Sequence, residues 1–418
     1  MMALLYAVQG SFWPLLGVHL AELGIGGRWR GLIFASQALA AAVVPLAAGQ
    51  LVDRLMSTRR YLVLVYGLGA LILAILASGW VDRPGWLFVI FLVYWAMIAP
   101  TNGLSSSLAM RNLDNPRGEF GAVRLWGTVG WMAVGWLVSG LMLAAGSARS
   151  STLGAGGMHE VFAVAAGLSL VMSLFCRLLP ETPPLATAST GRANLRQGLA
   201  VARRADVRVF LITTFGLYLT MPLVYQVMPG YLAARGLSRP WIASAMSLGQ
   251  VLEVVTLLVL PWLLGRIGVK WTMVVGLAAW SLRFLTLAVN PPLWLAVGGG
   301  LLHGVGYGCF TVGGQVFLDG AAPKTHRASA QALFLIVSTG MGSLLGSLWA
   351  GERTRGDAST LAHDGLLFLI PFLLNAALLV YFLARFRADR GEESGLRQAS
   401  FSPREMIHGR RNPIHQTD

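Results

Sequence analysis

The sequence predicts an all-α polytopic membrane protein with twelve transmembrane helices in two six-helix halves. Three observations carry this prediction: an apolar composition, a series of apolar segments long enough to span a bilayer, and a repeat at half the length of the chain. Of the 418 residues, 55% are hydrophobic and 12% are charged, whereas soluble domains average about 25% charged residues. This composition excludes a soluble enzyme and a disordered chain.

Twelve apolar segments are long enough to cross the bilayer as helices, which takes about 20 residues each. The first segment lacks the charged start and the cleavage site of a signal peptide, so we interpret it as a span. The predicted spans are 3–23, 31–52, 61–80, 86–110, 121–145, 159–179, 207–232, 240–264, 271–289, 292–317, 328–351 and 364–385.

The basic residues predict how the spans are oriented. The net charge is +14, and Arg and Lys mark the ends of the apolar segments instead of gathering in one domain, which favours a membrane and not nucleic acid. If the N-terminus is cytoplasmic, the inner loops and the tail hold most of these residues. The positive-inside rule therefore places both termini in the cytoplasm.

A long connection divides the spans into two groups of six. Residues 181–206 contain prolines and a Ser/Thr/Ala stretch, and we predict that they form a cytoplasmic linker. Residues 1–180 are then the N-terminal half and residues 207–386 the C-terminal half. The polar, basic residues 387–418 form a predicted cytoplasmic tail.

A repeat supports this division. Residues 49–54 (GQLVDR) follow the second span, and residues 265–270 (GRIGVK) follow the eighth. Each alone could be a simple cytoplasmic turn, in which Asp53 and Arg54 have a gating or structural role. Together, at half-chain spacing, they indicate a tandem duplication of six-helix units. That is the architecture of the major facilitator superfamily, in which the solute binds at the midplane between the halves.

Glu253 and Gln250 are the first candidates for a solute site, because a charge at the bilayer centre costs about 2.5–3.5 kcal/mol. Glu253 is the acidic residue that we place deep in a span, and Gln250 shares its helical face. The pair can bind hydroxyls or ring nitrogens of a polar solute, and Glu253 can also exchange a proton during transport. In the structural alternative, Glu253 merely holds Arg283 or a backbone group.

Arg124, Thr128 and Trp131 form a second candidate group, in the fifth span. An arginine, a hydroxyl and an aromatic ring can together bind a flat polar ring by hydrogen bonds and stacking. The alternative for Arg124 is an anchoring or inner-gate role, in which its side chain extends to the inner surface.

Tyr225 and Gln226 are candidates in the seventh span. They lie between Pro222 and Pro229, and prolines in a span free backbone groups toward a cavity.

His303, Tyr307 and Arg283 are the remaining candidates inside spans. His303 in the tenth span can carry a proton, and its alternative is a simple interhelical hydrogen bond. Tyr307 follows four residues later and shares its face. Arg283 in the ninth span is interpreted as a gating or packing residue, with solute contact as the alternative.

The sequence contains no motif for enzymatic chemistry, a cofactor or a metal. The expected partners are a small solute, protons and the lipid bilayer, without nucleic acid, and the expected state is a monomer.

Several of these segments resemble the nucleoside:proton symporter family of the major facilitator superfamily, the bacterial nucleoside and xanthosine permeases. Residues 123–131 (VRLWGTVGW) are similar to that family's Arg-x-Trp-Gly-Thr-x-Gly segment. The other similar segments are 100–102 (PTN), 250–253 (QVLE), 279–284 (AWSLRF) and 327–331 (RASAQ), the last of which contains the gating candidate Arg327.

The resemblance implies a midplane nucleoside site made by Arg124, Thr128, Trp131, Gln250 and Glu253, with further residues from the seventh and tenth spans.

The tenth span departs from the family pattern. The family usually has a Tyr-Asp-Phe-Phe segment there, whereas this chain has YGCF at 307–310, with Gly308 in place of the aspartate. Three explanations are open. Glu253 carries proton coupling alone, or His303 takes the place of the aspartate, or this protein has a different solute or mechanism from the rest of the family.

The function that we predict is proton-coupled uptake of nucleosides or a related polar ring solute by alternating access. The alternatives are a major facilitator carrier for another solute, in sugar uptake or efflux, and a non-transporting sensor on the same fold.

Overall fold

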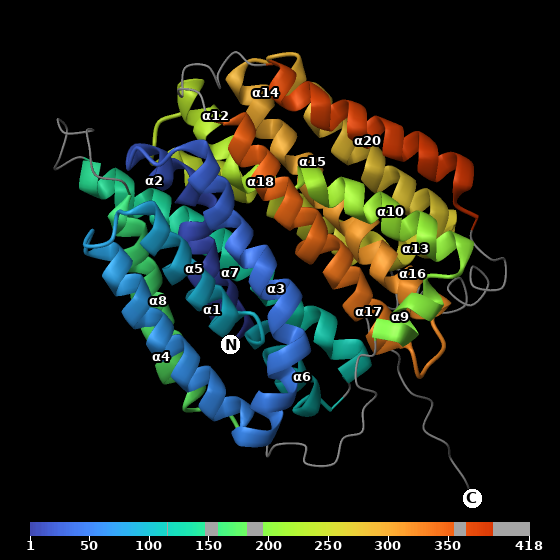
Figure 1. The fold of residues 1–418 in the computed structure, drawn as a ribbon, viewed down its shortest axis with the longest axis horizontal. Coiled ribbons are helices and arrows are strands. Elements are labelled where there is room, and N and C mark those ends of the chain that lie inside the picture. Colours follow the sequence, from blue (N-terminus) through green and yellow to red (C-terminus); the bar gives the residue numbers. More distant parts are fainter. Residues whose placement is uncertain (115, 147–157, 182–194, 355–364, 388–418) are drawn as a thin grey trace, which may run out of the picture.

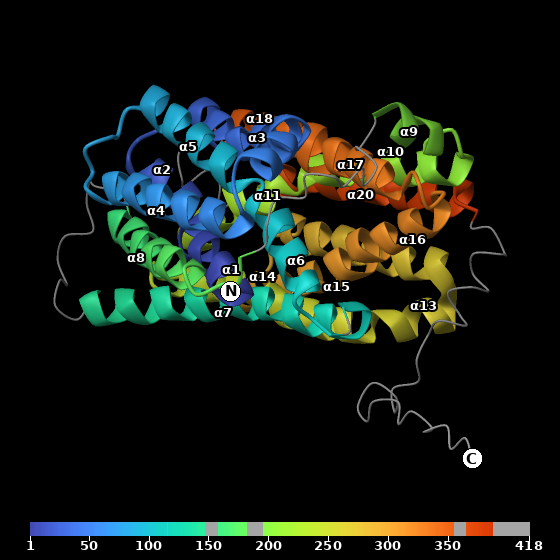
Figure 2. The ribbon, with the colours of Figure 1, turned by 90° about the horizontal axis from the view of Figure 1, so that it is seen from below.

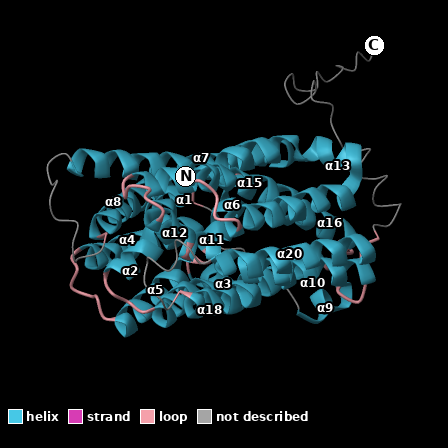
Figure 3. Cartoon of the chain, turned by 90° about the horizontal axis from the view of Figure 1, so that it is seen from above, coloured by secondary structure: helices cyan, strands magenta, loops and turns pink. Residues whose placement is uncertain are grey.

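The computed structural model describes residues 1–114, 116–146, 158–181, 195–354 and 365–387. Every regular element in these residues is a helix, and the helices are joined by loops (Figure 3). Ten of the helices or helix series are long and apolar enough to cross a membrane. The prediction of an all-α polytopic membrane protein is therefore confirmed.

The N-terminal half contains the first six spans. A proline interrupts two of them, because proline lacks the amide that a helix interior needs: Pro14 lies in the short η1, and Pro100 separates α5 from α6. The elements are α1 (Met2–Phe12), η1 (Trp13–Leu15), α2 (Leu16–Glu22), α3 (Gly27–Leu55), α4 (Thr58–Ala77), α5 (Pro84–Ile98), α6 (Thr101–Arg111), α7 (Pro116–Gly146) and α8 (His159–Cys176).

The C-terminal half contains the other six spans, several of them broken. Pro222 and Pro229 divide the seventh span into three helices, and the tenth and eleventh each contain a π-helical segment. The elements are α10 (Ala205–Thr220), α11 (Pro222–Gln226), α12 (Met228–Ala234), α13 (Trp241–Ala288), α14 (Leu293–Gly298), η2 (Gly299–Leu301), α15 (Leu302–Gly306), η3 (Tyr307–Val312), α16 (Gly313–Ala321), α17 (Arg327–Leu335), η4 (Ile336–Gly342), α18 (Ser343–Arg353) and α20 (Gly365–Arg385).

Helix α13 contains two spans, because its backbone turns at Gly268. This residue has φ 77° and ψ 170°, a conformation that glycine adopts without steric cost. The turn lies within residues 265–270, the second copy of the repeated loop. With α13 counted as two spans and α3 as the second span, each of the twelve predicted spans has a helical counterpart.

The helices form two groups that meet along a central interface (Figure 1). In the N-terminal group, α1 packs on α7 and α4 packs on α8; in the C-terminal group, α13 packs on α15 and α20. The most extensive contacts between the groups are those of α3 with α18 and of α7 with α13, the second pair lying along the lower edge of Figure 2. This arrangement confirms the two six-helix halves of the major facilitator fold.

Some predictions fall on parts of the chain that lie outside the described residues. They include half of the linker, 182–194, and the tail from 388 onward. A short helix, α9 (Leu195–Val201), lies at the end of the predicted linker and packs on α17. The boundaries of the halves stay predictions. Asp53 and Arg54 lie in the last turn of α3, and their side chains are outside the described residues.

Candidate functional site

The predicted site residues Thr128 and Glu253 meet at the interface between the halves. Thr128 on α7 donates a hydrogen bond from Oγ1 to Oε1 of Glu253 on α13, at 3.4 Å. Thr128 is buried, while Glu253 is half-buried. Among the described residues, Glu253 makes no ion pair with Arg283, because that guanidinium has no partner for its Nε or Nη1. The structure therefore gives no support to the alternative in which Glu253 merely holds Arg283.

Arg124 packs on an aromatic ring of the first span. Its guanidinium carbon lies 4.4 Å from the centre of the Tyr6 ring, within the range of a cation–π interaction. Gly127 makes this approach possible, because a Cβ there would lie 2.7 Å from Cδ2 of Tyr6. The guanidinium is also within electrostatic reach of Glu253. Arg124 is thus turned toward α1 and the interface, not extended along the helix toward the surface.

Tyr6 is a residue of this site that the sequence did not single out. It lies in an apolar first span, and its contact with Arg124 joins residues more than a hundred positions apart. The signal that could have found it is the glycine in the segment 123–131, since a glycine within a span often marks close approach of another helix.

Trp131 and Tyr225 also meet across the interface. Their ring centres are 6.2 Å apart, with an interplanar angle of 71°. The hydroxyl of Tyr225 lies 3.5 Å from the side-chain amide of Gln250, which is buried. The structure therefore brings Trp131 of one half together with Tyr225 and Gln250 of the other.

Gln226, the other candidate of the seventh span, lies elsewhere. Its side chain is buried, and neither its amide nitrogen nor its oxygen has a hydrogen-bond partner. Its carbonyl packs closely on Gly17 of α2. Between the two neighbouring candidates, Tyr225 is the one that joins the other site residues.

His303 lies in a cluster of aromatic rings. Its ring is 5.2 Å from that of Trp280 in an edge contact, and 6.1 Å from each of Tyr225 and Tyr307. The rings of His303 and Tyr307 are stacked, so the structure brings these two candidates together. Tyr307 is also the first residue of the π-helical segment η3, and such segments are frequent at functional sites.

Gly308, where the family pattern has an aspartate, packs against α13. A Cβ on Gly308 would lie 2.6 Å from Cγ2 of Thr256, which leaves no room for a side chain in this packing. A carboxylate at position 308 would therefore face a helix contact and not the wall formed by Tyr225 and Gln250. The absence of the aspartate is consistent with tight packing of the eighth and tenth spans.

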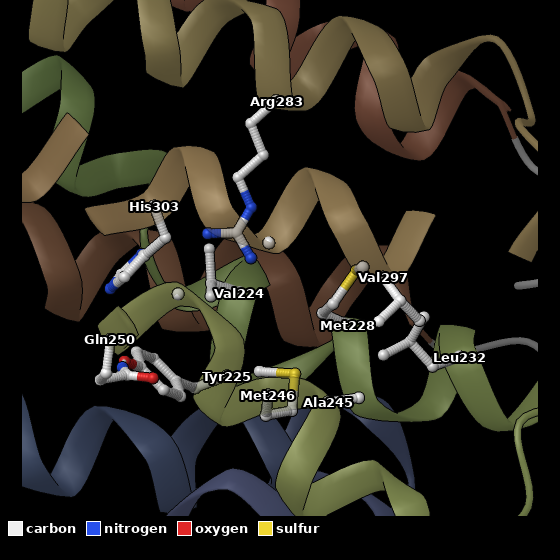
Figure 4. A pocket seen from close by; sticks show the side chains of 12 residues that line it. Val224, Tyr225, Met228, Leu232, Ala245, Met246, Gln250, Arg283, Val297 and His303 are labelled. Carbon is white, nitrogen blue, oxygen red and sulfur yellow. The ribbon is translucent and has the colours of Figure 1, made fainter. Parts of the chain in front are cut away.

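A small pocket lies next to these residues inside the C-terminal half (Figure 4). Arg283 and His303 extend into it from α13 and α15, and Tyr225 and Gln250 form another part of its wall. The rest of the lining is apolar; it consists of Val224, Met228, Leu232, Ala245, Met246, Gly249, Val297 and Gly300.

The gating candidate Arg327 does not line this pocket; it is the first residue of α17. Its Nη1 is 3.2 Å from Oδ2 of Asp319, and both side chains are nearly half exposed. Both residues belong to the C-terminal half. Among the described residues, no cluster of three or more His, Cys, Asp or Glu side chains is placed to hold a metal ion.

The halves are in close contact at one end of the bundle. Arg239 of the C-terminal half pairs with Glu22 of the N-terminal half at 2.9 Å. Nearby, α3 and α18 pack through glycines: a Cβ on Gly351 would lie 2.5 Å from the carbonyl oxygen of Gly27 and 2.7 Å from Cα of Gly31. These residues lie in or beside the loops that follow the first, seventh and eleventh spans, so they share one side of the membrane.

Comparisons with known proteins identify the family of the chain. Residues 1–391 match the family model described as nucleoside H+ symporter. The putative nucleoside transporter YegT and the xanthosine permease of Escherichia coli (strain K12) are 28% and 29% identical to the chain. Each match covers 83% of this chain, with 81% of YegT and 84% of the xanthosine permease.

The fold has a solved counterpart. The crystal structure of the nucleoside transporter NupG superposes with a TM-score of 0.79 at 23% identity, over 93% of this chain and 98% of that chain. The likeness confirms the major facilitator fold, and the match of the family model over most of the chain confirms the family expected from the sequence. The chain is a multi-pass membrane transporter and not an enzyme, and it belongs to the nucleoside H+ symporter family.

Proposed function

We propose that the protein carries nucleosides together with protons into a bacterial cell, across the inner membrane, as a monomer with both termini in the cytoplasm. The observation that carries this proposal is the contact between Thr128 and Glu253, which joins the two halves at a carboxylate. A carboxylate at a moving interface can bind a solute hydroxyl or a proton, and it can release either when the halves separate.

The solute would lie between two walls of different chemistry. The N-terminal wall supplies Arg124, Thr128 and the ring of Trp131, and the C-terminal wall supplies Gln250 and Glu253. Nucleosides have a flat ring that can stack on Trp131 and sugar hydroxyls that can bond to the carboxylate and the amide. The names of relatives that share the family, the nucleoside transporter YegT and the xanthosine permease, support this class of solute.

The orientation that the basic residues predict also predicts which side of the membrane this conformation is closed to. With both termini inside, the end at which Arg239 meets Glu22 faces the outside. The conformation is then closed to the outside, as a transporter is when it releases its solute into the cytoplasm. Uptake by alternating access requires a second conformation, in which these contacts break and the opposite ends of the helices meet.

Uptake into proteoliposomes tests this function. We expect labelled nucleoside to accumulate when an inward proton gradient is imposed and to equilibrate without accumulation when it is not. Glu253→Gln should abolish accumulation, because a glutamine has no proton to exchange. Glu119→Gln, which changes an exposed carboxylate at the start of α7, is the matched control and should behave as wild type.

Accumulation by Glu253→Gln would show that another group carries the proton. Accumulation of sugars in place of nucleosides would favour the carrier for another solute. Binding without transport of any solute would favour the sensor.

Binding measurements test the two walls separately. Arg124→Ala and Gln250→Ala should each weaken nucleoside binding by about 1–3 kcal/mol, the cost of leaving a buried polar partner unpaired. Unchanged affinity in both variants would place the solute elsewhere.

A further inference from the structure

We infer that Arg283 and His303 form a binding site for a single anionic group, in the pocket of the C-terminal half shown in Figure 4. The anionic group has two possible sources: a free chloride ion, or an ionised oxygen of the solute itself. The second source rests on the proposed function, and the first does not.

The guanidinium of Arg283 is a buried charge without a counter-ion. Arg283 is 4% exposed, and neither Nε nor Nη1 has a hydrogen-bond partner. No carboxylate of the described residues makes an ion pair with it. Its nearest aromatic neighbour is Trp280 on the same helix, whose ring centre is 5.6 Å from the guanidinium carbon. Buried charges are normally paired, so an anion is the partner that this environment lacks.

The two arginines inside the spans differ in this respect. Arg124 has the ring of Tyr6 at 4.4 Å and the charge of Glu253 within reach. Arg283 makes no ion pair with a carboxylate of the described residues, and the group within its electrostatic reach is the uncharged hydroxyl of Tyr225. The charge of Arg124 is thus compensated by the protein, whereas that of Arg283 is left for a ligand.

The pocket offers a second donor and an apolar surround. His303 is 5% exposed, and its Nδ1 has no hydrogen-bond partner. Figure 4 shows both side chains at the wall of this pocket, the guanidinium pointing into its centre and the imidazole beside it. Met228, Leu232 and Val297 line the rest of it, and such an apolar wall strengthens the attraction between the guanidinium and an anion.

The free space limits what can bind. The pocket has about 10 Å³ of free volume, enough for one water-sized group. A halide or one oxygen fits, and a complete nucleobase does not. Because Tyr225 and Gln250 also form part of the wall, a solute ring held against them could direct one ionised oxygen toward Arg283.

Thermal unfolding of the purified protein tests the chloride source. The protein is compared in sodium chloride and in sodium gluconate at equal ionic strength, since gluconate is too large for the pocket. We expect chloride to raise the unfolding midpoint of the wild type, because a ligand that binds the folded state stabilises it by mass action. The shift should vanish in Arg283→Gln and persist in the control variant Arg208→Gln, which changes an exposed arginine of α10 outside the pocket.

Solute binding in gluconate tests the other source. Xanthosine has an acidic ring N–H between two carbonyls and is largely ionised at neutral pH, whereas inosine is neutral. If the solute supplies the anion, the wild type should prefer xanthosine, and Arg283→Gln should reduce that preference tenfold or more while inosine binding is retained. A chloride shift identifies the free ion, a xanthosine preference identifies the solute, and either supports the site.

The inference is overturned if the wild type shows neither a chloride shift nor a xanthosine preference, or if the effect that the wild type does show survives in Arg283→Gln. Should Arg283→Gln fail to fold, Arg283→Lys, which keeps the charge, takes its place and should retain the anion dependence of the wild type in weakened form. If the wild type binds no nucleoside at all, the proposed function is wrong. The chloride measurement does not depend on nucleoside binding and still tests the anion site.

Discussion

The two ends of the bundle use their charged residues differently. At the end that we place outside, ion pairs cross from one half to the other; at the opposite end, they stay within a half. The crossing pairs are Arg239 with Glu22 and with Glu160, and Arg28 with Glu352. At the opposite end, Arg327 with Asp319 remains in one half, and Arg59 pairs with Glu181, the residue that directly follows the N-terminal half. One end is therefore held closed by contacts between the halves, and the other can open without leaving these charges unpaired.

Glycines distinguish the two ends as well. At the closed end, Gly27, Gly31 and Gly351 let the backbones of α3 and α18 touch. Such backbone contact is the usual means of helix association in a bilayer, where no hydrophobic effect drives the helices together. Closure at this end thus depends on the absence of side chains, and the ion pairs add to it.

The largest effect should come from filling this glycine contact. In Gly351→Val the new Cβ would lie 2.5 Å from the carbonyl oxygen of Gly27, and a backbone atom cannot move aside alone. Overpacking of this kind costs about 1–3 kcal/mol, which should prevent closure of this end and abolish uptake. Spin-label distances across the end should lengthen.

Gly140→Val is the matched control, because Gly140 is exposed on α7 and a Cβ there has open space around it. The control should transport normally. Normal transport by Gly351→Val as well would show that closure does not need the α3–α18 contact.

A smaller effect should come from breaking the ion pair across the same end. Arg239→Gln removes the 2.9 Å contact with Glu22, in which both side chains are partly buried, and also the longer 3.8 Å contact with Glu160. The expected cost is up to about 1 kcal/mol, the upper range for such pairs. The same spin-label distances should shift part of the way toward the open form.

The double variant Arg239→Gln with Glu22→Gln measures the interaction energy of the ion pair separately from the other effects of each substitution. If the pair acts as a unit, the second substitution should add little to the first. Full additivity would mean that the ion pair contributes nothing to closure.

The sequence was a good guide to the spans, because each depends on a local property. The prolines at 100 and 222 mark observed helix breaks, and the glycine turn at 268 lies inside the predicted loop. The last predicted span, 364–385, ends at the same residue as α20, Arg385. The length and apolarity of a segment, and the effects of proline and glycine on the backbone, depend only on residues that are close together in the sequence.

The site was predictable only in part, because it depends on which helices meet. The contact of Arg124 with Tyr6 and the lack of a partner for Arg283 both follow from packing between distant segments. Gly308 is the clearest example: the family pattern identifies a missing aspartate, but the packing on Thr256 explains why a side chain is not accommodated there.

The smallest effect should come from the end that we place inside. Arg327→Gln removes the 3.2 Å pair with Asp319, in which both side chains are nearly half exposed and belong to the same half. Exposed pairs contribute about 0.2–1 kcal/mol, so the unfolding midpoint should change little. The spin-label distances at the closed end should match those of the wild type, because neither partner touches the other half in this conformation.

Uptake by Arg327→Gln sharpens the comparison between the ends. The gating role predicted for Arg327 requires that it meet the N-terminal half in the outward-open conformation, when the inner ends of the helices come together. Slower uptake with an unchanged midpoint and unchanged distances in the closed-outside form is therefore the expected result. If the distances at the outer end lengthen as they do in Arg239→Gln, then Arg327 acts on the conformation described here, and the division of roles between the two ends is wrong.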